Sequence, residues 1–202
     1  MPTSKKYKLC RRLGAAIYEK CQTAKFAQSE PVVKKGKKPG GRRSDYGNQL
    51  IEKQKVRFMY GVRERQFSNY VAKAMEHSAK GTTPATLLFQ QLEERLDNVV
   101  YRLGFAHTRA LSRQMVSHGH FTVNGKKFTI PSYTVKQGDV IAVREGSKST
   151  TLFKDIGLKL KAIKKPDWFT WDEQAVTAKV SGDPKNPDAF LNFQAVIEFY
   201  SR

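Results

Sequence analysis

The sequence reads TRALSRQMVSHGHFTVNGKKFTIPSYTVKQGDVIAVRE over residues 108–145, and its hydrophobic period changes within this stretch. Thr108 can accept a hydrogen bond from the first turn of a helix, which we expect to run to about His118. Beyond that point the apolar residues alternate, as in a half-buried strand. The stretch therefore predicts a helix followed by strands.

A β-hairpin is predicted directly after this helix. Asn124-Gly125 is a dipeptide that tolerates positive φ and favours a two-residue type I′ turn. We expect the returning strand to run from Lys126 to Ile130, and a further strand from Asp139 to Arg144. Helices combined with antiparallel strands indicate an α+β chain.

Helical spacing of apolar residues also marks the chain before this stretch. It predicts two short helices with a break at Gly61, then a longer helix ending at Gly104, where glycine suits a helix C-terminus. The positions concerned are Leu50, Val56 and Met59, then Phe67, Val71 and Met75, and finally Leu88, Leu92, Leu96, Val99 and Leu103.

The other segments give weaker patterns. Pro, Gly and cations without apolar periodicity predict an extended loop over Val32–Arg43. Residues 150–164 are weakly helical, and Pro166 ends that run. Apolar residues alternate from Leu191 to Phe199, which predicts a half-buried strand.

The chain is strongly basic, with 37 Lys and Arg against 18 Asp and Glu and a formal charge of +19. This excess indicates a polyanionic partner. A membrane would require an amphipathic anchor or a long apolar span, and we find neither, so nucleic acid is favoured. No apolar run of signal-peptide length is present and two cysteines are too few for a secreted disulfide scaffold, so we expect a cytoplasmic setting.

The charge is distributed unevenly along the chain. Residues 1–48 carry +10, residues 49–104 carry +3, residues 105–165 carry +9 and residues 166–202 carry −3. We expect RNA to contact the first three segments and something else to contact the acidic last one.

Enzymatic function is poorly supported. Gly36 and Gly41 are spaced as in a phosphate-binding loop, but Arg42 and Arg43 replace the required Lys-Ser/Thr and no apolar strand precedes them. Backbone flexibility is the favoured role of these glycines. We predict no catalytic residue and no small-molecule substrate.

The histidines and cysteines do not have the spacing of a metal site. His118 and His120 lie in a short turn, where hydrogen bonding to RNA or backbone is favoured over a shared metal. Cys10 and Cys21 are eleven residues apart, unlike the C-x2-C pair of a zinc finger. We predict no metal and no other cofactor.

Cations interleaved with aromatic residues indicate RNA binding in two segments, Glu52–Phe67 and Thr108–Lys127. Lys and Arg bind phosphates, and aromatic and guanidinium planes stack on exposed bases. A solvated helix face would resemble the first segment by charge alone, but the second lies in a stretch, residues 105–137, that contains no acid. There Arg109, Arg113 and Ser117 share a helix face, which Lys126 and Lys127 could extend. The predicted RNA-binding residues are Arg42, Arg43, Tyr46, Lys53, Lys55, Arg57, Tyr60, Arg63, Arg65, Arg109, Arg113, Ser117, His118, His120, Lys126 and Lys127.

Three blocks resemble the bacterial family of the fourth small-subunit ribosomal protein. They are SDYGNQLIEKQKVRFMYGVRERQF from Ser44, LEERLDNVVYRLGF from Leu92, and the stretch over residues 108–145 quoted above. Residues 166–202 resemble the family more loosely. The resemblance implies a mostly helical domain of residues 1–90, with a long basic N-terminal loop, completed by residues 166–202. An RNA-binding module of two helices and a small antiparallel sheet would be inserted at residues 91–165.

The resemblance also implies a role as a structural constituent of the small ribosomal subunit. Members bind small-subunit ribosomal RNA early, nucleate its 5′ domain, lie beside the third and fifth small-subunit proteins where mRNA enters, and influence translational accuracy. Arg42 and Arg43 would lie close to incoming mRNA. Repression of its own mRNA would be an added role.

Two departures from the family pattern concern the N-terminal segment and the helix after Thr108. Many relatives hold zinc with four N-terminal cysteines, but Tyr7 stands where the first is expected and Phe26 near the last. The resemblance therefore implies a zinc-free member. Leu111 replaces an acid that could complete a capping box after Thr108.

Two other functions are compatible with parts of the sequence. An RNA-modifying enzyme with the same module would need a catalytic domain that residues 166–202 cannot hold. A free-standing RNA-binding regulator has the same sequence features, and sequencing the RNA bound in cells would separate it from a ribosomal protein.

Overall fold

A computed structural model describes residues 6–24, 26, 44–78, 81–154, 160, 163, 165–173, 175–185 and 190–202. The chain forms two compact units, one of residues 1–88 with 187–202 and the other of residues 89–186. The predicted loop Val32–Arg43 lies outside the described residues, and so do Arg42 and Arg43 of the predicted RNA site. No helix in the described part is long and apolar enough to span a membrane.

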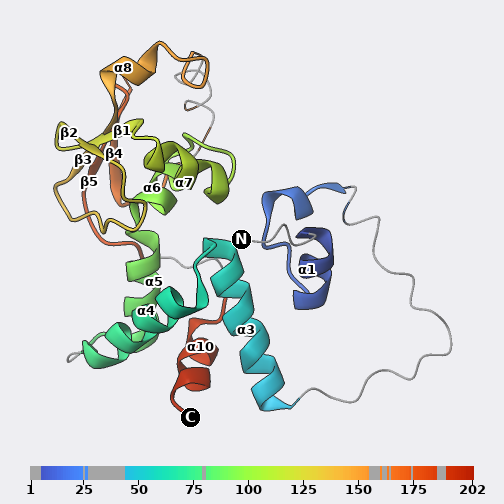
Figure 1. Cartoon of the computed structure of the whole chain (residues 1–202). Helices are drawn as coiled ribbons and strands as arrows, with labels where there is room; N and C mark the ends of the chain where they lie inside the picture. Colours follow the sequence, from blue (N-terminus) through green and yellow to red (C-terminus); the bar gives the residue numbers. More distant parts are fainter. Residues whose placement is uncertain are drawn as a thin grey trace. The chain divides into compact units, whose positions relative to one another are not determined.

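The first unit is built from helices in its described part (Figure 1). Its elements are α1 (Lys6–Leu13), the short 3-10 helix η1 (Glu19–Cys21), α3 (Asp45–Tyr60), α4 (Glu64–Glu76), the first half of α5 (Pro84–Glu93) and the C-terminal helix α10 (Phe193–Tyr200). Gly61 ends α3 with a φ of 62°, a conformation that other residues adopt with strain, so the predicted break is confirmed.

The segment predicted as a C-terminal strand is a helix, α10 (Phe193–Tyr200). The prediction was wrong because so many of these eight residues are apolar that both periods fit. Asn192 favours the helix, since its side chain accepts a hydrogen bond from the Ala195 amide at 2.9 Å. The buried side chains of α10 follow helical spacing, and the helix packs against α3.

The long helix predicted to end at Gly104 is two helices, α5 and α6 (Leu96–Arg102). Arg95 between them has an extended backbone and forms a bridge with Thr134. The Leu96 amide donates to the Tyr133 carbonyl at 2.8 Å, so the chain here pairs with a distant segment and not with the preceding turn. The second helix does end at Gly104, whose φ is 91°.

The second unit contains a helix pair, α6 and α7 (Arg109–Ser117), and a five-stranded antiparallel sheet in the order β2-β1-β3-β5-β4. The predicted hairpin is confirmed, since Asn124 and Gly125 have φ of 51° and 78°. The strands are β1 (Phe121–Val123), β2 (Lys126–Phe128), β3 (Val140–Val143), β4 (Phe169–Asp172) and β5 (Thr177–Val180), and α8 (Glu145–Lys148) follows β3. The chain is therefore α+β, as expected.

Strands β4 and β5 correct the predicted domain boundary. We expected residues 166–202 to complete the helical unit, but β5 pairs with β3 and with β4, so residues 166–186 belong to the sheet unit. Each strand has only four residues, too few for its alternation to be recognised in the sequence. Of the weakly helical segment predicted before Pro166, Thr151–Lys154 form turns, and most of the remainder lies outside the described residues.

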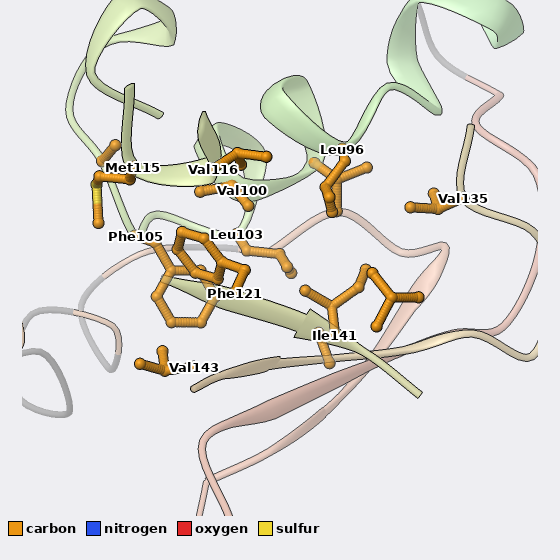
Figure 2. Packing of buried hydrophobic residues seen from close by; sticks show 14 of the residues in the cluster. Leu96, Val100, Leu103, Phe105, Met115, Val116, Phe121, Val135, Ile141 and Val143 are labelled. Carbon is orange, nitrogen blue, oxygen red and sulfur yellow. The ribbon is translucent and has the colours of Figure 1, made fainter. Parts of the chain in front are cut away.

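One face of the sheet is buried against α6 and α7 (Figure 2). Leu96 and Val100 of α6, Leu103 just after it, and Met115 and Val116 of α7 pack against side chains of β1 and β3. The strand residues are Phe121, Val123, Ile141 and Val143. We call this the inner face of the sheet, and the opposite one the outer face. Since side chains alternate along a strand, each strand residue points to either the inner or the outer face.

Candidate RNA interface

Arg109 stands at the start of α7, after Thr108 has capped that helix by accepting a hydrogen bond from the Leu111 amide at 3.1 Å. Its side chain is only 8% exposed. The Nε atom donates to Asn98 Oδ1 at 2.8 Å, and the guanidinium lies 4.3 Å from the centroid of the Tyr101 ring. Arg109 therefore ties α7 to α6 from within the module.

Arg113, one turn further along α7, is held by a buried carboxylate. Its Nε donates to Asp97 Oδ2 at 2.7 Å, and Arg95 donates two hydrogen bonds to the same carboxylate at 2.8 and 3.1 Å. Asp97 is 2% exposed, whereas the Arg113 side chain remains 32% exposed. A buried carboxylate with two guanidinium partners fixes the direction in which Arg113 leaves the helix.

A second buried carboxylate, Glu93, was not identified from the sequence. It accepts from Arg102 at 2.7 and 2.9 Å and from the Asn98 side chain at 2.9 Å. Asn98 thereby joins Glu93 to Arg109. In the sequence, the acids and arginines that alternate in the Leu92–Phe105 block were the only indication of this hydrogen-bond network.

Lys126 and Lys127 are both exposed but do not share a face of the sheet. Lys126 lies opposite Val123, whose side chain is in the core, and Lys127 lies opposite Thr122. Alternation therefore directs Lys126 to the inner side at the β2 edge and Lys127 to the outer face. Our expectation that both lysines extend one face is wrong for this reason.

The turn from α7 into β1 brings further predicted residues close to Lys127. A Cβ at Gly119 would collide with the Lys127 side chain, so this glycine leaves room for the lysine to lie across the turn. Ser117 and His118, just before Gly119, are exposed. These residues form an exposed polar cluster at the end of α7.

His120 is more enclosed than His118. Its Nδ1 is 3.0 Å from Ser147 Oγ, and its ring packs edge-on against Phe153. Burial, followed by the charges of His118 and Arg144, lowers its pKa. Arg144 donates to the same Ser147 Oγ at 3.4 Å and is a half-buried cation of this cluster that sequence reasoning missed.

In the helical unit, Lys53 is a buried structural cation. It is 7% exposed, and its ammonium donates to Glu64 Oε1 at 2.6 Å and lies 4.7 Å from the Phe199 ring centroid. Burial alone would raise the pKa of Glu64, but hydrogen bonds from Lys53 and Tyr200 outweigh burial and lower it. Lys53 thus holds α3, α4 and α10 together.

The other predicted residues of this unit divide between interior and surface. Tyr60 is 2% exposed, Lys55 pairs with Glu52 at 2.7 Å, and Arg57 pairs with Glu64 at 3.1 Å. Arg63 and Arg65 are exposed, as is Tyr46, which packs against Phe199. Of these residues, Tyr46, Arg63 and Arg65 are the exposed ones that a ligand can reach, and helix periodicity did not distinguish them from the rest.

Cys10 and Cys21 are free thiols, 1% and 2% exposed. Burial and a hydrogen bond with Cys10 raise the pKa of Cys21 to about 12. Tyr7 and Phe26, which stand at expected cysteine positions, stack with their ring centroids 5.7 Å apart. Among the described residues, no group of three or more His, Cys, Asp or Glu could hold a metal ion.

Comparison with known proteins covers almost the whole chain. A family model described as the ribosomal protein S4/S9 N-terminal domain matches residues 2–93, and the S4 domain matches residues 94–141. Small ribosomal subunit protein uS4 of Roseiflexus sp. (strain RS-1) is 48% identical over 202 residues, 96% of each chain. The uS4 protein of Akkermansia muciniphila is 43% identical over 205 residues, 99% of this chain and 98% of the relative.

The chain belongs to the uS4 family. It is a ribosomal protein of the bacterial type and not an enzyme. The S4 domain match ends inside β3, so β4 and β5 of this uS4 member lie beyond the matched residues.

Proposed function

We propose that the chain is a structural constituent of the small subunit of cytoplasmic ribosomes and a primary binder of small-subunit ribosomal RNA that nucleates its 5′ domain. The observation that carries this proposal is the uS4 relationship over nearly the full length. Two exposed cations of the sheet unit, Lys126 and Lys127, lie in a stretch without an acid from residue 105 to 137 and support RNA as the ligand.

The contacts are divided between direct and indirect ones. Lys126, Lys127, Ser117 and His118 are exposed and bind phosphate or sugar groups. Arg109, buried against Asn98 and Tyr101, positions α7 and does not itself grip phosphate. In the sheet unit, further contacts come from Arg113 and His120. In the helical unit, Tyr46, Arg63 and Arg65 contribute contacts of their own, and the buried or half-buried Lys53, Lys55, Arg57 and Tyr60 support the fold.

From the resemblance to the family, we also propose that the chain lies where mRNA enters the ribosome. There it would contact the third and fifth small-subunit proteins and influence translational accuracy. Arg42 and Arg43 would contact incoming mRNA. Much of the apolar C-terminal tail is used inside the chain, because Phe199 packs on Tyr46 and Lys53. Tyr46 remains 51% exposed and offers surface to a protein neighbour.

A sucrose-gradient profile of a lysate tests the proposal. The chain should sediment with small subunits and remain there in high salt, and a pool found only as free protein would contradict it. Crosslinking in cells, followed by sequencing of the bound RNA, tests the added role. Recovery of the chain's own mRNA beside ribosomal RNA would support translational repression.

A further inference from the structure

The outer face of the five-stranded sheet carries two continuous rows of side chains, defined by the strand register. One row runs Lys127, Thr122, Ala142, Thr177 and Asp172 across all five strands. The other runs Val140, Lys179 and Thr170 across β3, β5 and β4. Their sequence neighbours fill the inner core, so these residues point away from α6 and α7.

We propose that this outer face is a second RNA-binding surface of the chain, which contacts the sugar-phosphate backbone. The inference rests on the proposed function and extends it to strands β4 and β5, which lie beyond the S4 domain match.

Charge and side-chain size favour RNA as the occupant. Lys179 is exposed on β5. Lys127, which the outer face shares with the polar cluster at the end of α7, is exposed on β2, three strand spacings or roughly 14 Å away across the sheet. The residues between them are short. The Thr122 hydroxyl donates to the Ala142 carbonyl at 3.4 Å, and the Thr177 hydroxyl can donate to phosphate or 2′-hydroxyl oxygens. Asp172 is the one acid of these rows, and its carboxylate already accepts from the Ala175 amide at 3.1 Å.

The same side chains disfavour a protein occupant and base-specific readout. Protein interfaces depend on large aromatic or arginine anchors, and neither row contains one. Bases are recognised largely by stacking on aromatic rings, which the rows also lack. The face is therefore suited to the sugar-phosphate backbone of double- or single-stranded RNA of any sequence.

Two substitutions test the surface in the full chain. Lys179→Glu removes a cation, and Ala142→Glu places a carboxylate at the centre of the face, where the side chain is half-buried and directed away from the core. Lys136→Glu is the matched control, because Lys136 is exposed in the turn before β3 and belongs to neither row. Lys179→Gln serves as a milder variant, and thermal unfolding confirms that each protein is folded.

Affinity for a small-subunit ribosomal RNA fragment is measured over a series of salt concentrations. Lys179→Glu should weaken binding about tenfold at moderate salt and lower the slope of log affinity against log salt by about one, and Ala142→Glu should also weaken binding. Lys136→Glu should do neither. If wild type binds and both face variants match it, the outer face is not an RNA site; failure of wild type to bind would instead refute the proposed function.

Directed cleavage identifies the occupant in assembled subunits. Because both natural cysteines are buried, a thiol introduced by Thr170→Cys, on the exposed part of β4, can be labelled selectively with an iron chelate that generates hydroxyl radicals. Cleavage of ribosomal RNA beside this label, at positions different from those cut from labelled Lys136→Cys, supports the proposal. Cleavage confined to a neighbouring protein would overturn it.

Discussion

Arg109 and Lys127 are two cations to which the sequence assigns one role, but they have opposite surroundings. Arg109 is enclosed by Asn98 and Tyr101, and Lys127 is exposed on the outer face. Spacing along a helix predicted correctly that Arg109 and Arg113 stand one turn apart, but not that Asn98 and Asp97 engage them. Such partners lie on another helix, so a pattern within α7 cannot reveal them.

Substitution of these two residues should separate stability from binding. We expect Arg109→Ala to lower the free energy of unfolding by about 2 kcal/mol, because a buried hydrogen bond and a cation–π contact are lost. Lys127→Ala should leave folding within about 0.5 kcal/mol but lower the salt slope of RNA binding by about one. Denaturant titration and RNA binding measure the two effects. A normal stability with a reduced slope in Arg109→Ala would show that Arg109 contacts phosphate.

Glu94, at the break between α5 and α6, should make stability depend on pH. Burial, followed by the charge of Asp183, raises its pKa from 4.5 to about 7. The folded state thus holds a proton that the unfolded state releases near pH 4.5, so stability should fall as the pH rises from about 4.5 to 7. Glu94→Gln removes this loss and should raise the unfolding temperature at pH 8, with little effect at pH 4. An equal shift at both pH values would point to packing instead of ionisation.

At the scale of elements, features determined by neighbouring residues were predicted from the sequence, and features determined by pairing with distant residues were not. The Asn124-Gly125 hairpin and the Gly61 and Gly104 helix ends depend on residues next to them, and all were predicted. The break at Arg95 depends on pairing with Thr134, and β5 depends on pairing with β3, so neither left a clear local pattern. The misassigned α10 shows the same limit, because its burial against α3 decides between two periods that its sequence allows.

The cap of α10 offers a test of that element. Asn192→Ala should destabilise the first unit by about 1 kcal/mol, because the Ala195 amide at the helix start loses its acceptor. Gln194→Ala, at an exposed position of the same helix, is the control and should change stability little. Hydrogen exchange of the α10 amides measures the effect. Equal protection in both variants would mean that packing on α3 alone holds the helix.

At the scale of the whole molecule, the boundary of the sheet unit can be tested by expression of fragments. We expect residues 89–186 to unfold cooperatively and residues 89–165 to lack a cooperative transition. The shorter fragment lacks β4 and β5 and so exposes one edge of β3, and loses Phe169, Ala178 and Val180 from the core. Calorimetry distinguishes the two. A cooperative transition in the shorter fragment would restore the boundary predicted from the sequence.

The position of β4, β5 and α10 in the sequence has a consequence for synthesis. Both units contain elements that follow residue 165, since β5 pairs with β3 and α10 packs on α3. At about 5–20 residues per second, residue 165 is reached roughly 8–33 s after initiation, and neither core can close before later residues emerge. Until then the nascent chain exposes apolar surface beside a large positive charge. We therefore expect chaperones, or RNA itself, to bind the nascent chain during translation.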